Sequence, residues 1–134
     1  MNKERITSII KDIERFFTDL DKIKVKDRED LESREKFYAV SMIIFSIVNR
    51  AIDLGEEIVS YKKLGLPTRY RDIFYLLKKN RMINTELYED ILDLVHFRNL
   101  AAHEYQTFSE EDVFSALEKI GIIRGFVNKV MKVL

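Results

Sequence analysis

Apolar residues recur every three or four positions from Asn2 to about Ile23, and charged residues fill most of the positions between them. This period places the apolar side chains on one face of an α-helix and the charges on the other. We therefore expect an amphipathic helix over residues 2–23, followed by a charge-rich connection from Lys24 to Asp30. The apolar stripe of this helix consists of Ile6, Ile9, Ile10, Ile13, Phe16, Phe17 and Leu20.

A second, longer helix is predicted from about Leu31 to Tyr61, and its middle has a different pattern. Residues 37–48 are apolar nearly all round the helix. A helix of that kind is buried on more than one side. In a chain of 134 residues, it belongs at the centre of a bundle or at a subunit interface.

The clearest break in the pattern lies within residues 62–68, which contain Gly65 and Pro67. Both residue types interrupt helices. Thr68 is the expected cap of a short third helix that ends near Lys79.

The last two predicted helices begin at caps that can be read from the sequence. Residues 79–81 form a second break, after which Asn84 or Thr85 can cap a helix that runs to about His103. Residues 109–112, Ser-Glu-Glu-Asp, have the form of a capping box. We expect the last helix to continue to the C-terminus, with its apolar stripe formed by Val113, Leu117, Ile120, Ile123, Val127, Val130 and Leu134.

The whole pattern predicts an all-α fold in one domain, residues 1–134: an up-and-down bundle of four long helices plus one short helix. Long elements agree with the low content of helix breakers, four Gly and one Pro. Apolar residues make up 46% of the chain, which is enough for a core. No stretch shows the alternation that is typical of strands.

Composition excludes several kinds of site and disfavours some locations. The chain has no cysteine, so it has no disulfide, thiolate metal site or cysteine nucleophile. The longest apolar run, residues 39–48, contains two serines and is too short to span a bilayer. The N-terminal segment lacks the pattern of a secretory signal. We expect a soluble, cytoplasmic protein that makes no contact with a membrane.

Charge is balanced overall but unevenly distributed. The formal net charge is zero, which argues against a protein that coats nucleic acid non-specifically. Between Tyr61 and Arg81 there is one acid, Asp72, and seven basic residues: Lys62, Lys63, Arg69, Arg71, Lys78, Lys79 and Arg81. This segment is either a short footprint on a phosphate backbone or a solvated face that balances acids elsewhere.

Arg98 occupies a position that packing alone would give to an apolar residue. In the predicted helix that ends near His103, the apolar stripe consists of Leu87, Ile91 and Leu94. Arg98 occupies the next position on this stripe, and two alanines follow at 101 and 102. Burying an unpaired guanidinium costs on the order of several kcal/mol, because the charge loses its hydration. Such an arginine therefore has either an anionic ligand or a carboxylate partner.

His103 lies five residues further on, roughly 140° round an ideal helix, beside Asn99 and His96. Near a helix C-terminus the macrodipole favours imidazolium, which suits an acid that protonates a leaving oxygen. Arginine suits the charge on a pentacoordinate phosphorus. RNA whose 2′-OH is the nucleophile needs no metal, so the pair is compatible with RNA cleavage. Such residues near a helix end also serve as a cap and a salt bridge.

Other polar residues fit metal binding less well. Asn49, Asp53 and Glu57 share one side of the second helix, where two carboxylates could bind a metal. We favour the alternative, in which Asp53 pairs with an arginine and Glu57 is solvated. His96 follows Asp93 at i+3, but no further histidine or cysteine completes a site, which favours a packing or surface role. We expect neither a metal nor a cofactor.

The segment Arg98-Asn99-x-x-x-His103-x-Tyr105 resembles the Arg-x4-His-x-Tyr signature of HEPN domains, and specifically of HepT-like toxins. Residues 49–55, Asn-Arg-Ala-Ile-Asp-Leu-Gly, and residues 65–68, Gly-Leu-Pro-Thr, also look like that family. The resemblance covers about Ile6 to Val130. It implies a helical bundle that dimerises and places two copies of the motif in one cleft.

The same resemblance implies an activity, a partner and roles for residues. Many HEPN proteins are metal-independent endoribonucleases, and HepT-like members pair with an MNT-type nucleotidyltransferase antitoxin. By position, Arg98 and His103 would be catalytic, Asn99 the polar residue after the arginine, and Asp53 the acid that orients the cleft. Tyr105 would be the residue that the antitoxin adenylylates to silence the toxin. A homodimer would also bring arginine and histidine together although one helix turns them apart.

Three hypotheses result. The first is a homodimeric endoribonuclease toxin that acts on RNA. The second is a catalytically silent HEPN subunit that binds a nucleotidyltransferase or a nucleotide. In the third, the chain is a helical interaction module and the motif is a coincidence.

Overall fold

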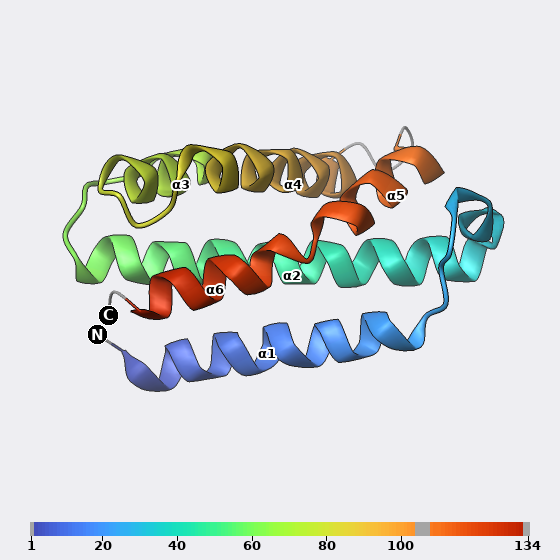
Figure 1. The fold of residues 1–134 in the computed structure, drawn as a ribbon, viewed down its shortest axis with the longest axis horizontal. Coiled ribbons are helices and arrows are strands. Elements are labelled where there is room, and N and C mark those ends of the chain that lie inside the picture. Colours follow the sequence, from blue (N-terminus) through green and yellow to red (C-terminus); the bar gives the residue numbers. More distant parts are fainter. Residues whose placement is uncertain (1, 104–107, 133–134) are drawn as a thin grey trace.

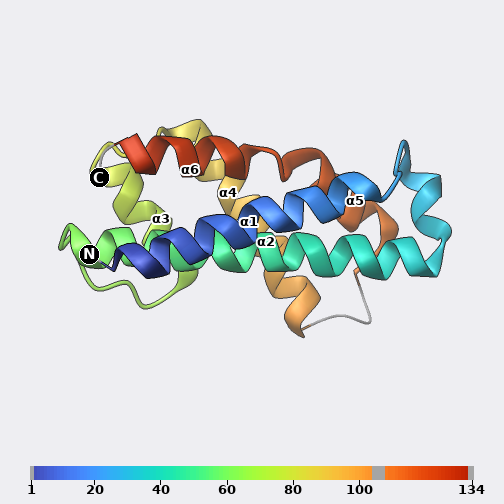
Figure 2. The same ribbon diagram turned by 90° about the horizontal axis from the view of Figure 1, so that it is seen from below.

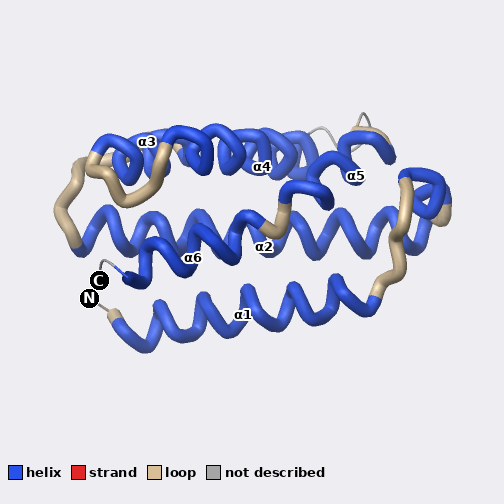
Figure 3. The backbone as a smooth tube through the Cα atoms, viewed as in Figure 1, coloured by secondary structure: helices blue, strands red, loops and turns tan. Residues whose placement is uncertain are grey.

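The computed structural model describes residues 2–103 and 108–132. These residues form helices and loops and contain no strand, as Figure 3 shows. The elements in chain order (Figure 1) are α1 (Lys3–Lys22), the 3₁₀-helix η1 (Arg28–Glu32), α2 (Arg34–Tyr61), α3 (Tyr70–Lys79), α4 (Thr85–His103), α5 (Glu110–Lys119) and α6 (Ile122–Lys132). The predicted all-α bundle is confirmed.

α2 is the central helix of the bundle, as its apolar circumference predicts. It contacts α1, η1 and all the remaining helices, and Figure 1 shows it between α1 on one side and α3 and α4 on the other. Its length and mean hydropathy of 1.5 would also suit a membrane span, but half of that apolar window is buried inside the fold. Burial in the core therefore accounts for the hydrophobicity of that half.

The ends of the elements follow local hydrogen bonds, some of them as predicted. Asn84 caps α4, since the Leu87 amide donates to its side chain at 2.8 Å, and Ser109 and Asp112 form the predicted capping box of α5. The expected cap at Thr68 is wrong. Instead, the Asp72 carboxylate accepts hydrogen bonds from the amide and hydroxyl groups of Thr68, and these bonds lower the pKa of Asp72.

Two boundaries differ from the sequence-based expectation. The start of the second helix is displaced to Arg34, because Asp27 and Asp30 form a capping box that folds residues 28–32 into η1. The last helix is divided into α5 and α6 at Ile120 and Gly121. Glycine is a poor helix former, and short-range bonds such as Arg124 amide to Gly121 carbonyl replace the regular ladder there. Val113, Ile120, Ile123 and Val130 of the apolar stripe are buried on the two sides of this break. Leu117 and Val127 are half-buried, and Leu134 lies outside the described residues.

α4 is inclined to α2, and this inclination determines where the motif lies. Figure 2 shows α4 crossing α2 so that its C-terminal end extends beyond the side of the bundle. The apolar residues Ile91, Leu94, Val95 and Phe97 anchor the earlier turns in the core. The last turns of α4, which carry Arg98 to His103, are therefore at the surface.

Candidate active site

Arg98 lies at the point where α4 leaves the core and crosses α2. Its side chain is half-buried, and its Nε donates a hydrogen bond of 2.8 Å to Oδ1 of Asn49 on α2. Nη1 donates to Oδ1 of Asn99 at 3.3 Å. The guanidinium carbon lies 5.2 Å from the ring centroid of Phe45 and 4.9 Å from that of Tyr70. Four side chains from three helices thus fix its orientation.

The described partners of Arg98 are neutral, and this decides which groups the guanidinium can still bind. Amide oxygens accept its hydrogen bonds and ring faces attract its charge, but neither group cancels that charge. Among the residues that the structure describes, no carboxylate lies within ion-pair distance of Arg98. The sequence left open an anionic ligand or a carboxylate partner, and the described part of the chain favours the anionic ligand.

His103 and Arg98 do not face the same way, in agreement with the angle expected from the helical period. His103 is the last residue of α4 and is exposed, whereas Arg98 is half-buried against α2. Tyr105 lies outside the described residues. One copy of the chain therefore does not combine the half-buried arginine and the exposed histidine into an enclosed site.

A groove of about 680 Å³ runs beside Arg98, between the start of α3 and α4. Its lining includes Arg69, Tyr70 and Arg71 from the α3 side and His96 and Asn99 from α4. Tyr70 joins the groove to Arg98, because its ring lines the groove and contacts the guanidinium. The sequence did not identify Tyr70 as a functional residue, since nothing in its local pattern reveals a contact with a side chain 28 residues away.

The basic segment between Tyr61 and Arg81 lies largely at the surface. All of its basic side chains are exposed except Lys78, whose ammonium lies 4.9 Å from the ring centroid of Tyr88. Only Arg69 among them pairs with a described acid, Asp72, at 3.4 Å. Because Arg69 and Arg71 line the groove, their position favours the phosphate footprint over a face that merely balances acids.

Asp53 takes part in an ion-pair network between α1 and α2. Its Oδ2 lies 3.0 Å from Nη1 of Arg50, and Nη2 of the same arginine lies 2.6 Å from Oδ2 of Asp12. The hydrogen bond to Asp12, and then that to Asp53, raises the pKa of Arg50. The predicted pairing of Asp53 with an arginine is confirmed. The expectation that Glu57 is solvated is wrong, because Glu57 forms an ion pair of 2.5 Å with Arg5.

His96 and Asp93 do not form a metal site within the described residues. His96 is exposed in the groove, and Asp93 instead pairs with Lys119 of α5. No group of three or more potential ligands gathers anywhere in residues 2–103 and 108–132. A surface role for His96 agrees with its exposure.

The all-α bundle is of the HEPN class, to which the family model that matches the chain belongs. The chain belongs to the HepT-like ribonuclease family, since the family model described as "Ribonuclease HepT-like" matches residues 6–130. The mRNA nuclease HepT of Shewanella oneidensis is 33% identical over 67 residues, which are 50% of this chain and 50% of that protein. The chain thus spans about half the length of the curated relative it matches.

Solved structures with the same fold include a tri-AMPylated Shewanella oneidensis HEPN toxin in complex with MNT antitoxin. Its TM-score is 0.78 at 23% identity, over 98% of this chain and 99% of that one. A toxin–antitoxin structure with AMP-PNP has a TM-score of 0.88 at 21% identity, over 97% and 99% of the two chains. The cytosolic protein YutE of Bacillus subtilis has a TM-score of 0.86 at 14% identity, over 100% and 91%. These likenesses concern the fold.

Proposed function

We propose that this chain is the toxin of a toxin–antitoxin pair, a metal-independent endoribonuclease that acts in the cytoplasm as a homodimer. The observation that carries the proposal is Arg98, a cation whose described partners are neutral and which lies beside a groove that Arg69 and Arg71 line. Membership of the HepT-like ribonuclease family supports it. So does the likeness to a relative named as an mRNA nuclease.

The proposed chemistry is transfer of the phosphoryl group to the neighbouring 2′-OH. The 2′ oxygen attacks phosphorus, the bond from phosphorus to the 5′ oxygen breaks, and the products are a 2′,3′-cyclic phosphate and a 5′-OH. Arg98 stabilises the extra negative charge on the pentacoordinate phosphorus. His103 gives a proton to the leaving 5′ oxygen, and water accepts the proton of the 2′-OH. Asn99 lies between the groove and Arg98, where it can orient the phosphate.

The homodimer is proposed because the exposed histidine and the half-buried arginine need a second copy to enclose them. An exposed apolar stripe on α2 supports it: Tyr38 is 59% and Met42 63% exposed. With half-buried Phe45 they share the helix face that continues to Asn49, the partner of Arg98. A second copy seated on this α2 stripe would border both arginines.

The proposed regulator is an MNT-type nucleotidyltransferase antitoxin that adenylylates Tyr105. An AMP group there would add a phosphate and a base close to Arg98 in sequence, so that it would neutralise charge and fill the cleft. Asp53 orients the cleft through its ion pair with Arg50. If Tyr105→Phe remained fully sensitive to the antitoxin and ATP, modification at this tyrosine would not be the mechanism.

The nuclease proposal is tested with purified protein and RNA in the presence of EDTA, beside Arg98→Ala and His103→Ala. Wild type should cleave and leave cyclic-phosphate and 5′-OH ends, and each variant should lose on the order of a hundredfold or more in rate. No cleavage by wild type, or equal cleavage by the variants, would remove the proposal. Wild type that binds the antitoxin without cutting RNA would point to a silent subunit.

A further inference from the structure

A second cavity lies on the other side of Tyr70, between the end of α2 and the loop that leads to α3. Its volume is about 580 Å³, within the range of small-ligand sites. Thr68, Arg69 and Tyr70 line both this cavity and the groove beside Arg98. The two hollows are therefore neighbours along the start of α3, and the cavity lies next to the proposed cleavage site.

The walls of the cavity suit a flat, partly apolar ring. Val59 and Ile73 line it, and Tyr70, which is 37% exposed, offers an aromatic face. Leu66 of the loop is 95% exposed, so an apolar side chain is available to cover a bound group. Aromatic and apolar side chains of this kind are what unpaired bases of single-stranded RNA stack upon.

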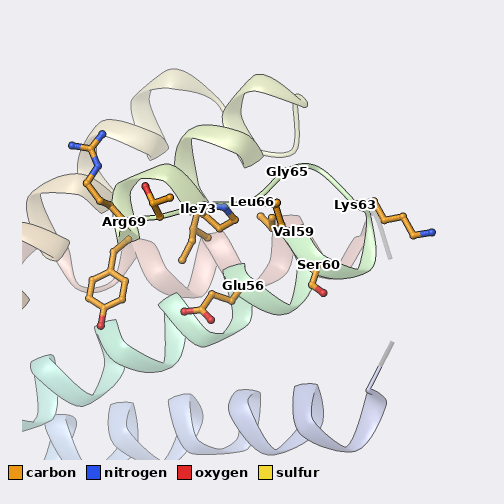
Figure 4. A pocket seen from close by; sticks show the side chains of 11 residues that line it. Glu56, Val59, Ser60, Lys63, Gly65, Leu66, Arg69 and Ile73 are labelled. Atoms are coloured by element: carbon orange, nitrogen blue, oxygen red, sulfur yellow. The ribbon is translucent and has the colours of Figure 1, made fainter.

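Among the described residues, Glu56 is the one acidic side chain that lines the cavity. Figure 4 shows it on α2, below the loop, while Lys63 and Arg69 point outward. Within the described residues Glu56 has no ion-pair partner. Partial burial, and then the charge of Asp53, raises the pKa of its carboxyl. A carboxylate in this position would be stabilised by a ligand that donates hydrogen bonds to it.

The two oxygens of a carboxylate are acceptors only, and this distinguishes the four RNA bases. The Watson–Crick edge of guanine presents two adjacent donors, N1–H and the exocyclic amino group. Adenine and cytosine present one amino donor beside a ring nitrogen that is an acceptor and repels the second oxygen. Uracil presents a single donor between two carbonyl oxygens. Guanine alone matches both oxygens of Glu56.

We propose that this cavity binds a guanine base of the RNA substrate, with Glu56 accepting hydrogen bonds from the base and Tyr70 stacking on it. The inference rests on the proposed nuclease function and adds a base preference next to the cleaved bond. Lys63 and Arg69, which point outward, bind the flanking phosphates. The adjacent nucleotide then lies in the groove, with its phosphate towards Arg98.

The test measures binding of short oligouridines that carry one central guanine or one central adenine. The protein is the His103→Ala variant, which keeps the RNA intact, and fluorescence anisotropy gives the dissociation constants. We expect roughly tenfold tighter binding of the guanine oligomer, the discrimination of a good bidentate pair. In Glu56→Gln the amide offers one acceptor and one donor, which match adenine, so the preference should move from guanine to adenine.

Glu35→Gln is the matched control, because Glu35 is an exposed carboxylate at the opposite end of α2, and it should leave the guanine preference unchanged. Circular dichroism confirms that each variant is folded. Equal affinity for the two oligomers, guanine preference that survives in Glu56→Gln, or no binding of either oligomer would each overturn the pocket. Guanine preference without cleavage by wild type would refute the nuclease alone, and cleavage without preference would refute the pocket alone.

Discussion

At the residue scale, the group that binds Arg98 is an amide rather than a carboxylate. Asn49 orients the guanidinium with a single neutral hydrogen bond, and Phe45 and Tyr70 enclose it with their rings. A carboxylate would orient the arginine equally well, but its negative charge would also neutralise the positive charge that attracts a phosphate. The neutral partner is thus what an anion-binding arginine requires.

Asn49→Asp tests this point, because the change keeps the size of the side chain and adds a charge. The new carboxylate should form an ion pair with Arg98, keep the stability of the fold or raise it slightly, and lower kcat/KM for RNA on the order of tenfold or more. Cleavage assays and urea denaturation measure the two effects. Full activity in Asn49→Asp would mean that Arg98 does not bind the phosphate.

Part of this site could be predicted from the sequence, and part could not. Arg98 was identified because it interrupts an apolar stripe within one helix, a local pattern. Asn49 and Tyr70 were not assigned as its partners, because those contacts depend on how α4 crosses α2 and α3. The solvated state expected for Glu57 was wrong for the same reason, since its partner Arg5 comes from another helix. Tertiary proximity was the missing information.

At the element scale, α2 and α3 pack closely at one point, where only glycine fits. A Cβ at Gly55 would lie 2.7 Å from Cγ2 of Ile73, a buried side chain of α3. The start of α3 carries Arg69 and Tyr70, so this contact also determines where the groove forms. By contrast, a Cβ at Gly125 in α6 would meet nothing within 4 Å.

Gly55→Ala and Gly125→Ala form a matched pair, because both change a glycine inside a helix to the best helix former. At Gly55 the clash should outweigh the gain in propensity and lower the free energy of unfolding by about 1–3 kcal/mol. At Gly125 the gain is unopposed and should raise it by about 0.5–1 kcal/mol. Urea denaturation measures both values. A stabilised Gly55→Ala would show that α2 and α3 are less tightly packed than described.

At the scale of the whole molecule, the most exposed large apolar side chains of α2 lie on the face that leads to the site. Met42 and Tyr38 lie on the side of α2 that the other helices leave uncovered, and the same face reaches Asn49 and Arg98. If an apolar side chain is exposed in the monomer and buried in the dimer, replacing it with a charged residue changes the stability of the fold little and weakens the dimer strongly.

Met42→Lys should therefore change the stability of the monomer by less than about 0.5 kcal/mol, while it weakens the dimer and reduces cleavage with it. Met131→Lys is the control, because Met131 is an exposed methionine on α6, away from the α2 stripe. Sedimentation velocity reports the assembly, and the same samples are assayed for cleavage. A dimeric, fully active Met42→Lys would move the interface to another face.

The orientation of Arg98 and His103 also predicts which subunit supplies each group. Because one α4 turns the two side chains apart, each complete site should combine Arg98 of one subunit with His103 of the other. Arg98→Ala and His103→Ala are then each inactive alone, but a mixed dimer holds one site in which both groups are intact. Free exchange makes half of the dimers mixed, so mixing equal amounts should restore about a quarter of wild-type activity. Sites completed within a single subunit would gain nothing on mixing, because each mutated chain would still lack one of the two groups.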